Sequence, residues 1–235
     1  MLIAAAVCPH PPMLVPEAAA GAAEELDPLR EACGTALAAL RAAGADRTVV
    51  VGGGADTADR GADPPASLRP YGVPVDLGPA GPAGTELPLS LTIGRWLLER
   101  AFPGPAPDRY QEVAADAAPE ECLRLGAELV ASAERVALLV MGDGTACRGS
   151  RSPGYYDERA EPYDTAVAAA LAAANPRKLA RLSPSVGAEL GAEGRAAWQV
   201  LAGAALAGGA DAFSGRLLFD EAPYGVGYFV AAWRG

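Results

Sequence analysis

The sequence predicts an α/β protein in which a layered, doubly wound sheet is flanked by helices. Three short apolar runs, at residues 2–7, 48–54 and 136–144, each end in proline or glycine, which is typical of strands buried on both faces. Longer segments with apolar residues at helical spacing separate these runs. No linker divides the chain, so we expect a single domain over residues 1–235.

The remaining elements follow from periodicity and from the residues that end each segment. Helices are predicted at 19–43, 86–101, 118–133 and 157–174, and one or two helices at 183–207. A short strand is predicted at 73–77, and a strand, a tight turn and a last strand at 217–233. Gly/Pro-rich loops are predicted at 78–84 and 103–108.

Composition excludes several classes of partner. The formal net charge of −10 argues against nucleic acid and against anionic membrane surfaces, because both require a basic face. The four cysteines form no C-x-x-C pair and suit reduced thiols. The first residues lack the basic and long apolar regions of a signal peptide, so we expect a cytoplasmic protein. A homodimer is one possible state, and no feature of the sequence marks an interface for it.

The strand ends predict where a ligand would bind. In layered α/β sheets, ligands bind beyond the carboxyl ends of the strands. The segments expected at that edge are His10, Gly52–Asp56, Gly142–Arg148 and Asp220–Glu221. We therefore expect a small-molecule pocket where these four segments converge.

His10 is the only histidine in the chain and lies in a loop that three prolines stiffen. A rigid loop at a strand end can direct an imidazole at a ligand or a metal. The alternative is a histidine that only hydrogen-bonds the backbone of its own turn. One histidine without a nearby carboxylate or cysteine at ligand spacing is weak evidence for a metal.

The segment after the third apolar run carries further candidates. Asp143 and Cys147 are candidate catalytic residues, although an aspartate here could simply fix its own turn. Arg148 beside Cys147 predicts a lowered thiol pKa, and Cys147 would then be the nucleophile of a hydrolase, the least favoured alternative. Arg148 and Tyr155 could contact a substrate as a cationic and aromatic lid, or merely cover a surface loop.

The glycine-rich loop is a candidate binding element. Gly53 and Gly54 could present backbone N–H groups to a substrate, but no nucleotide-binding motif or P-loop lysine accompanies them. Asp56 could ligate a metal or cap the next segment. Glu221 becomes a carboxylate ligand or base if His10 is near, although adjacent acids at a turn are usually solvated.

Together these segments resemble the class III extradiol ring-cleavage dioxygenases, the LigB-like and Memo-like proteins. The resemblance spans nearly the whole chain in order. It is carried by the Pro-His-Pro-Pro opening and by VVVGGGAD (49–56), VMGDGTACRG (140–149), the acidic stretch at 156–164 and EAPYGVGYFVAAW (221–233). It implies the layered α/β fold of the LigB-like dioxygenases.

In that family two histidines and a glutamate hold non-haem Fe(II), and a further histidine acts as acid and base. The resemblance places His10 at the first ligand, Ala55 or Asp56 at the second, and Glu221 at the carboxylate. The acid/base histidine falls at Ala146. Because these histidines are missing, most of the family's metal site is absent from this chain.

An oxygen-rich site of His10, Asp56 and Glu221 would suit Mn²⁺ or Zn²⁺ about as well as Fe²⁺, and the protein could also bind no metal. We therefore expect a divergent dioxygenase-like protein that acts on or binds a small, aromatic molecule. The alternative is a catalytically inactive binding or scaffold protein on the same fold.

Overall fold

The computed structural model describes residues 1–82, 84–101, 107–150, 152–209 and 212–235. Part of each predicted Gly/Pro-rich loop, residue 83 and residues 103–106, therefore lies outside the described residues. None of the described helices is both long enough and apolar enough to cross a membrane.

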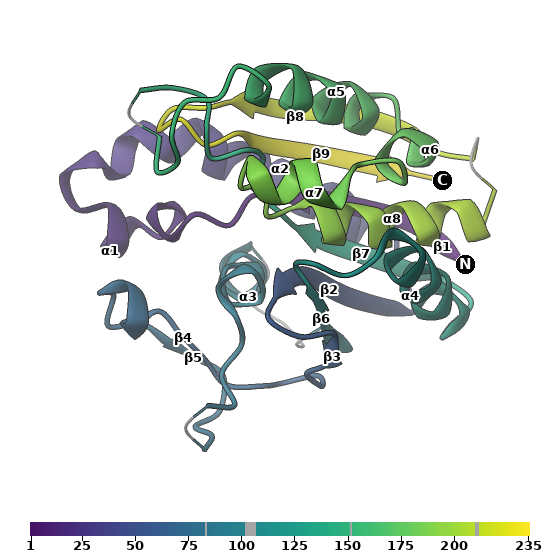
Figure 1. Cartoon of the computed structure of the whole chain (residues 1–235). Coiled ribbons are helices and arrows are strands. Elements are labelled where there is room, and N and C mark those ends of the chain that lie inside the picture. Colours follow the sequence, from purple (N-terminus) through teal and green to yellow (C-terminus); the bar gives the residue numbers. More distant parts are fainter. Residues whose placement is uncertain (83, 102–106, 151, 210–211) are drawn as a thin grey trace.

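A seven-stranded mixed sheet lies at the centre of the molecule (Figure 1), in the order β3-β6-β2-β7-β1-β9-β8. Strands β6, β2, β7 and β1 run parallel to one another. Strand β9 is antiparallel to β1, β8 is antiparallel to β9, and β3 is antiparallel to β6. The strands are β1 (Leu2–Cys8), β2 (Arg47–Gly54), β3 (Ala58–Asp59), β6 (Arg109–Ala114), β7 (Val136–Met141), β8 (Ser214–Glu221) and β9 (Tyr228–Arg234).

Helices cover both faces of the sheet, which confirms the layered α/β class. Figure 1 shows α4, α7 and α8 in front of the sheet and α2 behind it. The helices are α1 (Pro16–Ala19), α2 (Asp27–Ala42), α3 (Leu89–Ala101), α4 (Pro119–Ala131), α5 (Ala160–Ala172), α6 (Pro176–Leu179), α7 (Pro184–Glu189) and α8 (Arg195–Ala207). Short 3-10 helices lie at η1 (Pro12–Leu14), η2 (Ala20–Leu26) and η3 (Arg69–Tyr71).

The central strands are buried on both faces, as their unbroken apolar runs predict. Successive residues of a strand point to opposite faces. In β7, Leu138 and Val140 pack in the core beneath α4, α5 and α8, whereas Leu139 and Met141 pack in the core beneath α2 and α3. The same alternation in β1 and β2 fixes the register of the sheet, because a slip of one residue would exchange the two cores.

Helices α4 and α8 approach each other at two glycines. A Cβ atom on Gly203 would overlap the backbone of Leu123, and one on Gly126 would overlap the backbone of Val200. Small residues at these two positions therefore allow the helix backbones to touch.

Two predicted elements are shorter in the structure than the sequence indicated. Residues 73–77 do not form a strand of the main sheet: only β5 (Asp76–Leu77) is extended, and it pairs with β4 (Ala66–Ser67) in a separate two-stranded sheet. The regular helix predicted at 19–43 begins only at Asp27, because Pro28 provides a start and the preceding residues form the 3-10 helix η2.

Candidate functional site

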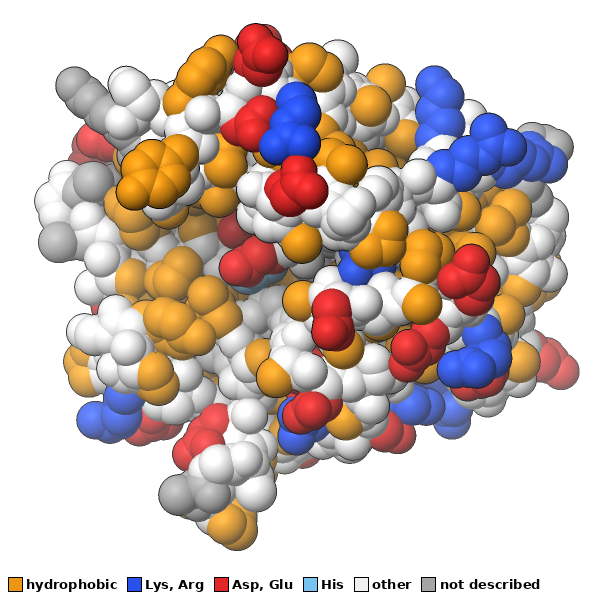
Figure 2. All heavy atoms as spheres, in the orientation of Figure 1, with side chains coloured by type: hydrophobic (Ala, Val, Ile, Leu, Met, Phe, Trp, Pro, Cys, Tyr) orange, Lys and Arg blue, Asp and Glu red, His pale blue; other side chains and the backbone are white. Residues whose placement is uncertain are grey.

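The C-terminal edge of the parallel strands brings three titratable side chains together. Strand β1 leads into His10, β7 leads into Asp143, and the segment between α7 and α8 supplies Glu193. Figure 2 shows the small exposed surface of histidine in a hollow of this face, with an acidic side chain beside it and apolar side chains around it. Of the four predicted segments, those of His10 and Asp143 therefore meet in this cluster, and Glu193 joins them from outside the prediction.

Asp143 fixes the position of His10. The backbone N–H of His10 donates to Asp143 Oδ1 at 2.7 Å, and His10 Nδ1 lies 3.5 Å from the same oxygen. His10 is 3% exposed and Asp143 is 8% exposed, so water screens this interaction little. Nδ1 has no hydrogen-bond partner within the described structure, and Asp143 is the carboxylate that it faces.

Glu193 meets the other side of the imidazole. His10 Nε2 and Glu193 Oε2 lie 3.0 Å apart, and the Glu193 side chain is 68% exposed. Glu193 directly precedes Gly194, the residue that caps the N-terminus of α8, where the helix dipole favours a negative charge. The imidazole is thus buried between one enclosed carboxylate and one carboxylate at the surface.

These carboxylates control the charge of His10. Burial alone would lower the pKa of His10, but Asp143 and Glu193 favour the imidazolium and raise the pKa above its ordinary 6.5. The hydrogen bond from His10 lowers the pKa of Glu193, whereas burial raises the pKa of Asp143. The pair therefore favours an imidazolium facing an ionised Glu193 carboxylate.

The pair gives stability a defined pH dependence. Because the pKa of His10 is raised, its contribution is complete below pH 6.5 and is lost as pH rises through the folded-state pKa. Because the pKa of Glu193 is lowered, its contribution is present above pH 4.5 and is lost as pH falls through the folded-state pKa. Replacing Glu193 with glutamine should therefore lower the free energy of unfolding most between pH 4.5 and 6.5.

The expected loss is at most about 1 kcal/mol, since Glu193 is largely exposed. Urea denaturation across pH measures it. Glu189→Gln is the matched control, because this acid pairs with Arg159 and not with histidine. An equal loss at pH 9 would contradict the assignment.

Glycines allow the three segments to approach. A Cβ atom on Gly142 would overlap Gly194, whose N–H donates to the Asp143 carbonyl oxygen at 2.8 Å. A Cβ atom on Gly53 would lie 3.2 Å from the Glu193 carbonyl oxygen. Gly53, predicted to bind substrate, therefore lies beside the cluster.

Gly54 and Asp56 lie farther along the same loop, against a buried acid. A Cβ atom on Gly54 would overlap the Glu112 carboxylate, which is 1% exposed and pairs with Arg60. The backbone N–H of Asp56 donates to Glu112 at 3.0 Å, while its side chain is 73% exposed and lies 3.8 Å from Arg60. Among the described contacts, Asp56 makes none with His10.

Arg148 is held by a second buried acid. Asp164 is 0% exposed and accepts hydrogen bonds from Thr145 N, Thr145 Oγ1 and Arg148 Nη1, at 2.9, 2.9 and 3.2 Å. Burial raises the pKa of Asp164 although these donors lower it. Asp164 thus anchors the loop that carries Asp143, and Arg148 serves first as its ion-pair partner.

The lowered pKa predicted for Cys147 was wrong. Cys147 is 6% exposed and packs against Ala160 and Leu190. Burial raises its pKa, and the charge of Asp157 adds to this effect. The neighbour in sequence, Arg148, points to Asp164 instead, and the charge of Arg159, which lowers the thiol pKa, does not outweigh burial.

The other two predicted site residues are Glu221 and Tyr155. Glu221 ends β8 and is exposed, opposite Tyr228 in the register of the hairpin. Tyr155 is 97% exposed. Neither makes a described contact with His10, Asp143 or Glu193.

The residues present do not fit the two-histidine, one-carboxylate iron site of the dioxygenase family. Among the residues that the structure describes, no group of three or more histidine, cysteine, aspartate or glutamate side chains is arranged to hold a metal ion. Of the predicted ligands, only His10 faces carboxylates in the described contacts, and these belong to Asp143 and Glu193 instead of Glu221.

Glu193 is not predictable as a site residue from the strand pattern, because no strand precedes it. It falls within the helical region predicted over 183–207, which is two helices, α7 and α8. The signal that could have located it is the pair Gly191 and Gly194: Gly191 has a positive φ of 64°, and Gly194 caps α8. An acid between two such glycines marks an exposed turn.

Comparison with known proteins supports the fold. The chain is similar to a solved structure described as an uncharacterized protein, JW3007, from Escherichia coli K12. The TM-score is 0.61 at 15% sequence identity, and the match covers 99% of this chain and 100% of that one. No family model matches the sequence, and no curated protein matches it. The likeness therefore shows a shared α/β fold, and the function has to be inferred from the residues of the site.

Proposed function

We propose that this chain binds, and transfers protons to or from, a small hydroxylated molecule at His10, on a scaffold resembling the extradiol dioxygenases. The observation that carries the proposal is the buried imidazole held between Asp143 and Glu193, with Nε2 3.0 Å from a largely exposed carboxylate. A histidine held between two carboxylates is suited to acid/base chemistry.

The geometry assigns different roles to the two acids. Asp143 is enclosed and bonded to the His10 backbone, so it orients the imidazole and stays in place when a ligand enters. Glu193 is exposed and can rotate, so a ligand hydroxyl can replace it at Nε2 and then bond both groups. Proton transfer by a positioned group contributes roughly 10²- to 10⁴-fold to a rate.

Aromatic residues near the cluster support an aromatic ligand. Burial raises the pKa of Tyr228, and the charge of Asp143 adds to the effect. Tyr71 is 46% exposed, and the Glu193 charge contributes to its raised pKa after burial. Each of these two acids therefore acts by its charge on an aromatic residue.

A divalent cation is the second candidate. Asp143 lies 3.5 Å from His10 Nδ1, and Nε2 is directed at the Glu193 carboxylate, so the imidazole presents Nε2 to a cation. His10 and Glu193 would be its two protein ligands. A site with two ligands is weak, and ring cleavage by the family route lacks its second ligand and its acid/base histidine.

The alternatives from other classes differ in what they predict. A binding or scaffold protein would bind the same molecule without turnover. A Cys147-dependent hydrolase would need a reactive thiol, and the raised pKa and burial of Cys147 argue against it.

Catechol is the probe that tests the proposal, with binding measured by calorimetry in buffer containing EDTA. We expect wild-type protein to bind it and His10→Ala to bind at least about tenfold more weakly, since hydrogen bonds to charged groups contribute about 1.5–3 kcal/mol. Asp56→Asn is the matched control and should bind normally. Mass spectrometry of metals in protein purified without an affinity tag tests the cation.

Wild-type and His10→Ala proteins that bind catechol equally would overturn the proposal. Binding that appears only after Mn²⁺ or Zn²⁺ is added, and is lost in His10→Ala, would favour the cation.

A further inference from the structure

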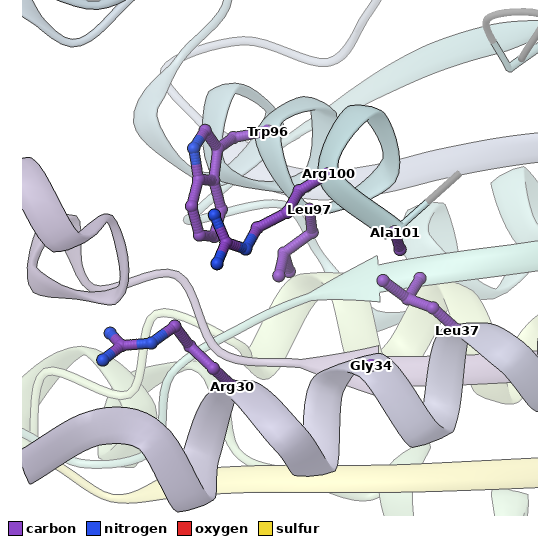
Figure 3. A pocket seen from close by; sticks show the side chains of 7 residues that line it. All are labelled: Arg30, Gly34, Leu37, Trp96, Leu97, Arg100 and Ala101. Atoms are coloured by element: carbon purple, nitrogen blue, oxygen red, sulfur yellow. The ribbon is translucent and has the colours of Figure 1, made fainter. Parts of the chain in front are cut away.

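A groove between α2 and α3 lies apart from the His10 cluster and has a volume of about 190 Å³. Figure 3 shows side chains from both helices directed toward the space between them. Its lining includes Arg30, Gly34, Leu37, Trp96, Leu97 and Arg100. Pockets for drug-sized ligands measure roughly 300–1,000 Å³, so this groove suits a smaller molecule.

The floor of the groove is apolar and well packed. Leu37, Leu97 and Trp96 are 0%, 4% and 8% exposed, respectively. These side chains belong to the core on the α2 and α3 side of the sheet, so the floor is rigid. An apolar body lying on it would be removed from water, at about 25 cal/mol for each Å² buried.

The charged side chains that line the groove are both arginines. The Arg30 guanidinium is tethered to Asp27 and to the carbonyl oxygens of Leu14 and Ala23. Arg100 is exposed, and its guanidinium carbon lies 5.5 Å from the centre of the Trp96 ring. Among the described contacts, no carboxylate pairs with Arg100, so its donors are available to an anion.

Gly34 leaves the space open from the side of α2. It lies inside a sixteen-residue helix, where glycine costs about 1 kcal/mol relative to alanine. No atom lies within 4 Å of the position that its Cβ would occupy, and its φ is not positive. Packing within the chain therefore does not require a glycine here, and its absent side chain keeps room over the groove.

We propose that this groove binds a small monocarboxylate with a compact apolar body, such as an arylacetate. The apolar body occupies the space that Gly34 leaves open above Trp96, and the carboxylate bonds the Arg100 guanidinium, which lies over the Trp96 ring. The chain carries a net charge of −10, yet both charged groups that line this groove are cations. Charge complementarity therefore favours an anionic ligand. Guanidinium is suited to bidentate binding of carboxylate.

Phenylacetate titrated into protein labelled with ¹⁵N tests the inference through the indole N–H resonances. Trp96 should shift with saturation, whereas the fully enclosed Trp198 and Trp233 should not. Arg100→Gln should weaken binding at least about tenfold by removing the charged hydrogen bonds. Phenylacetamide, which has the same shape without the charge, should bind wild-type protein similarly weakly.

Gly34→Leu gives a variant that fills the groove while favouring the helix, so loss of fold does not confuse its result. It should abolish the shift of Trp96. Thr35→Leu, at the next and exposed position of α2, and Arg124→Gln, at an exposed arginine of α4, are matched controls that should bind normally. Equal binding of phenylacetate and phenylacetamide, normal binding by Gly34→Leu, or no saturable shift would each overturn the proposal.

Discussion

Replacing Asp164 with alanine should lower the free energy of unfolding by about 3–5 kcal/mol, the cost of removing one partner of a buried ion pair. Asp164 is fully enclosed and accepts from the backbone and hydroxyl of Thr145 and from Arg148. Alanine would leave the Thr145 N–H and the Arg148 charge without this acceptor. The loop that carries Asp143 would lose its anchor as well.

Glu161→Ala is the matched control, because Glu161 faces the same Arg148 but is 77% exposed at 3.9 Å. Its effect should stay within about 0.5 kcal/mol. Chemical denaturation of both variants measures the difference. Similar losses in the two variants would show that enclosure of Asp164 is not what anchors the loop.

Gly203→Val should destabilise the protein by about 3 kcal/mol or more, at the upper end of costs for overpacking. Any Cβ atom at Gly203 meets the backbone of Leu123, which cannot rotate away as a side chain can. Helices α4 and α8 would have to separate over the core that they share. Thermal and urea unfolding measure the loss.

The control for Gly203 lies at the end of the same helix. A Cβ atom on Gly208 would lie 3.8 Å from its nearest neighbour, and its φ of −96° suits any residue. Gly208→Ala should therefore change stability by no more than about 0.5 kcal/mol. If the two variants were equally stable, close contact between α4 and α8 would not limit the size of residue 203.

Three of the four parallel strands, β1, β2 and β7, were predictable because burial on both faces leaves an unbroken apolar run, as in β7. Strand β6 was missed because its centre is Gln111 and Glu112, which are buried but polar. These two side chains are satisfied by groups distant in sequence, the carbonyl oxygen of Ala58 and the guanidinium of Arg60. Such partners exist only after folding, so a local pattern does not reveal them.

The site, like the fold, was predictable only where its residues follow apolar strands. His10 and Asp143 follow apolar strands, and the rule that ligands bind at strand ends placed them together. Glu193 reaches the cluster from between two helices, and its position depends on tertiary contacts: the packing of Gly194 against Gly142 and the hydrogen bond from Gly194 to Asp143. The direction of the Cys147 pKa was wrong because adjacency in sequence to Arg148 says nothing of where the guanidinium points.

The ionisation of His10 tests the central claim most directly. The chain has one histidine, so its imidazole ¹H–¹³C resonance needs no assignment, and a pH titration gives its pKa. We predict a pKa above 6.5 that falls in Glu193→Gln, and a saturable change in the resonance when catechol is added. A pKa at or below 6.5, with no response to Glu193→Gln or to catechol in folded protein, would contradict an acid/base binding site at His10.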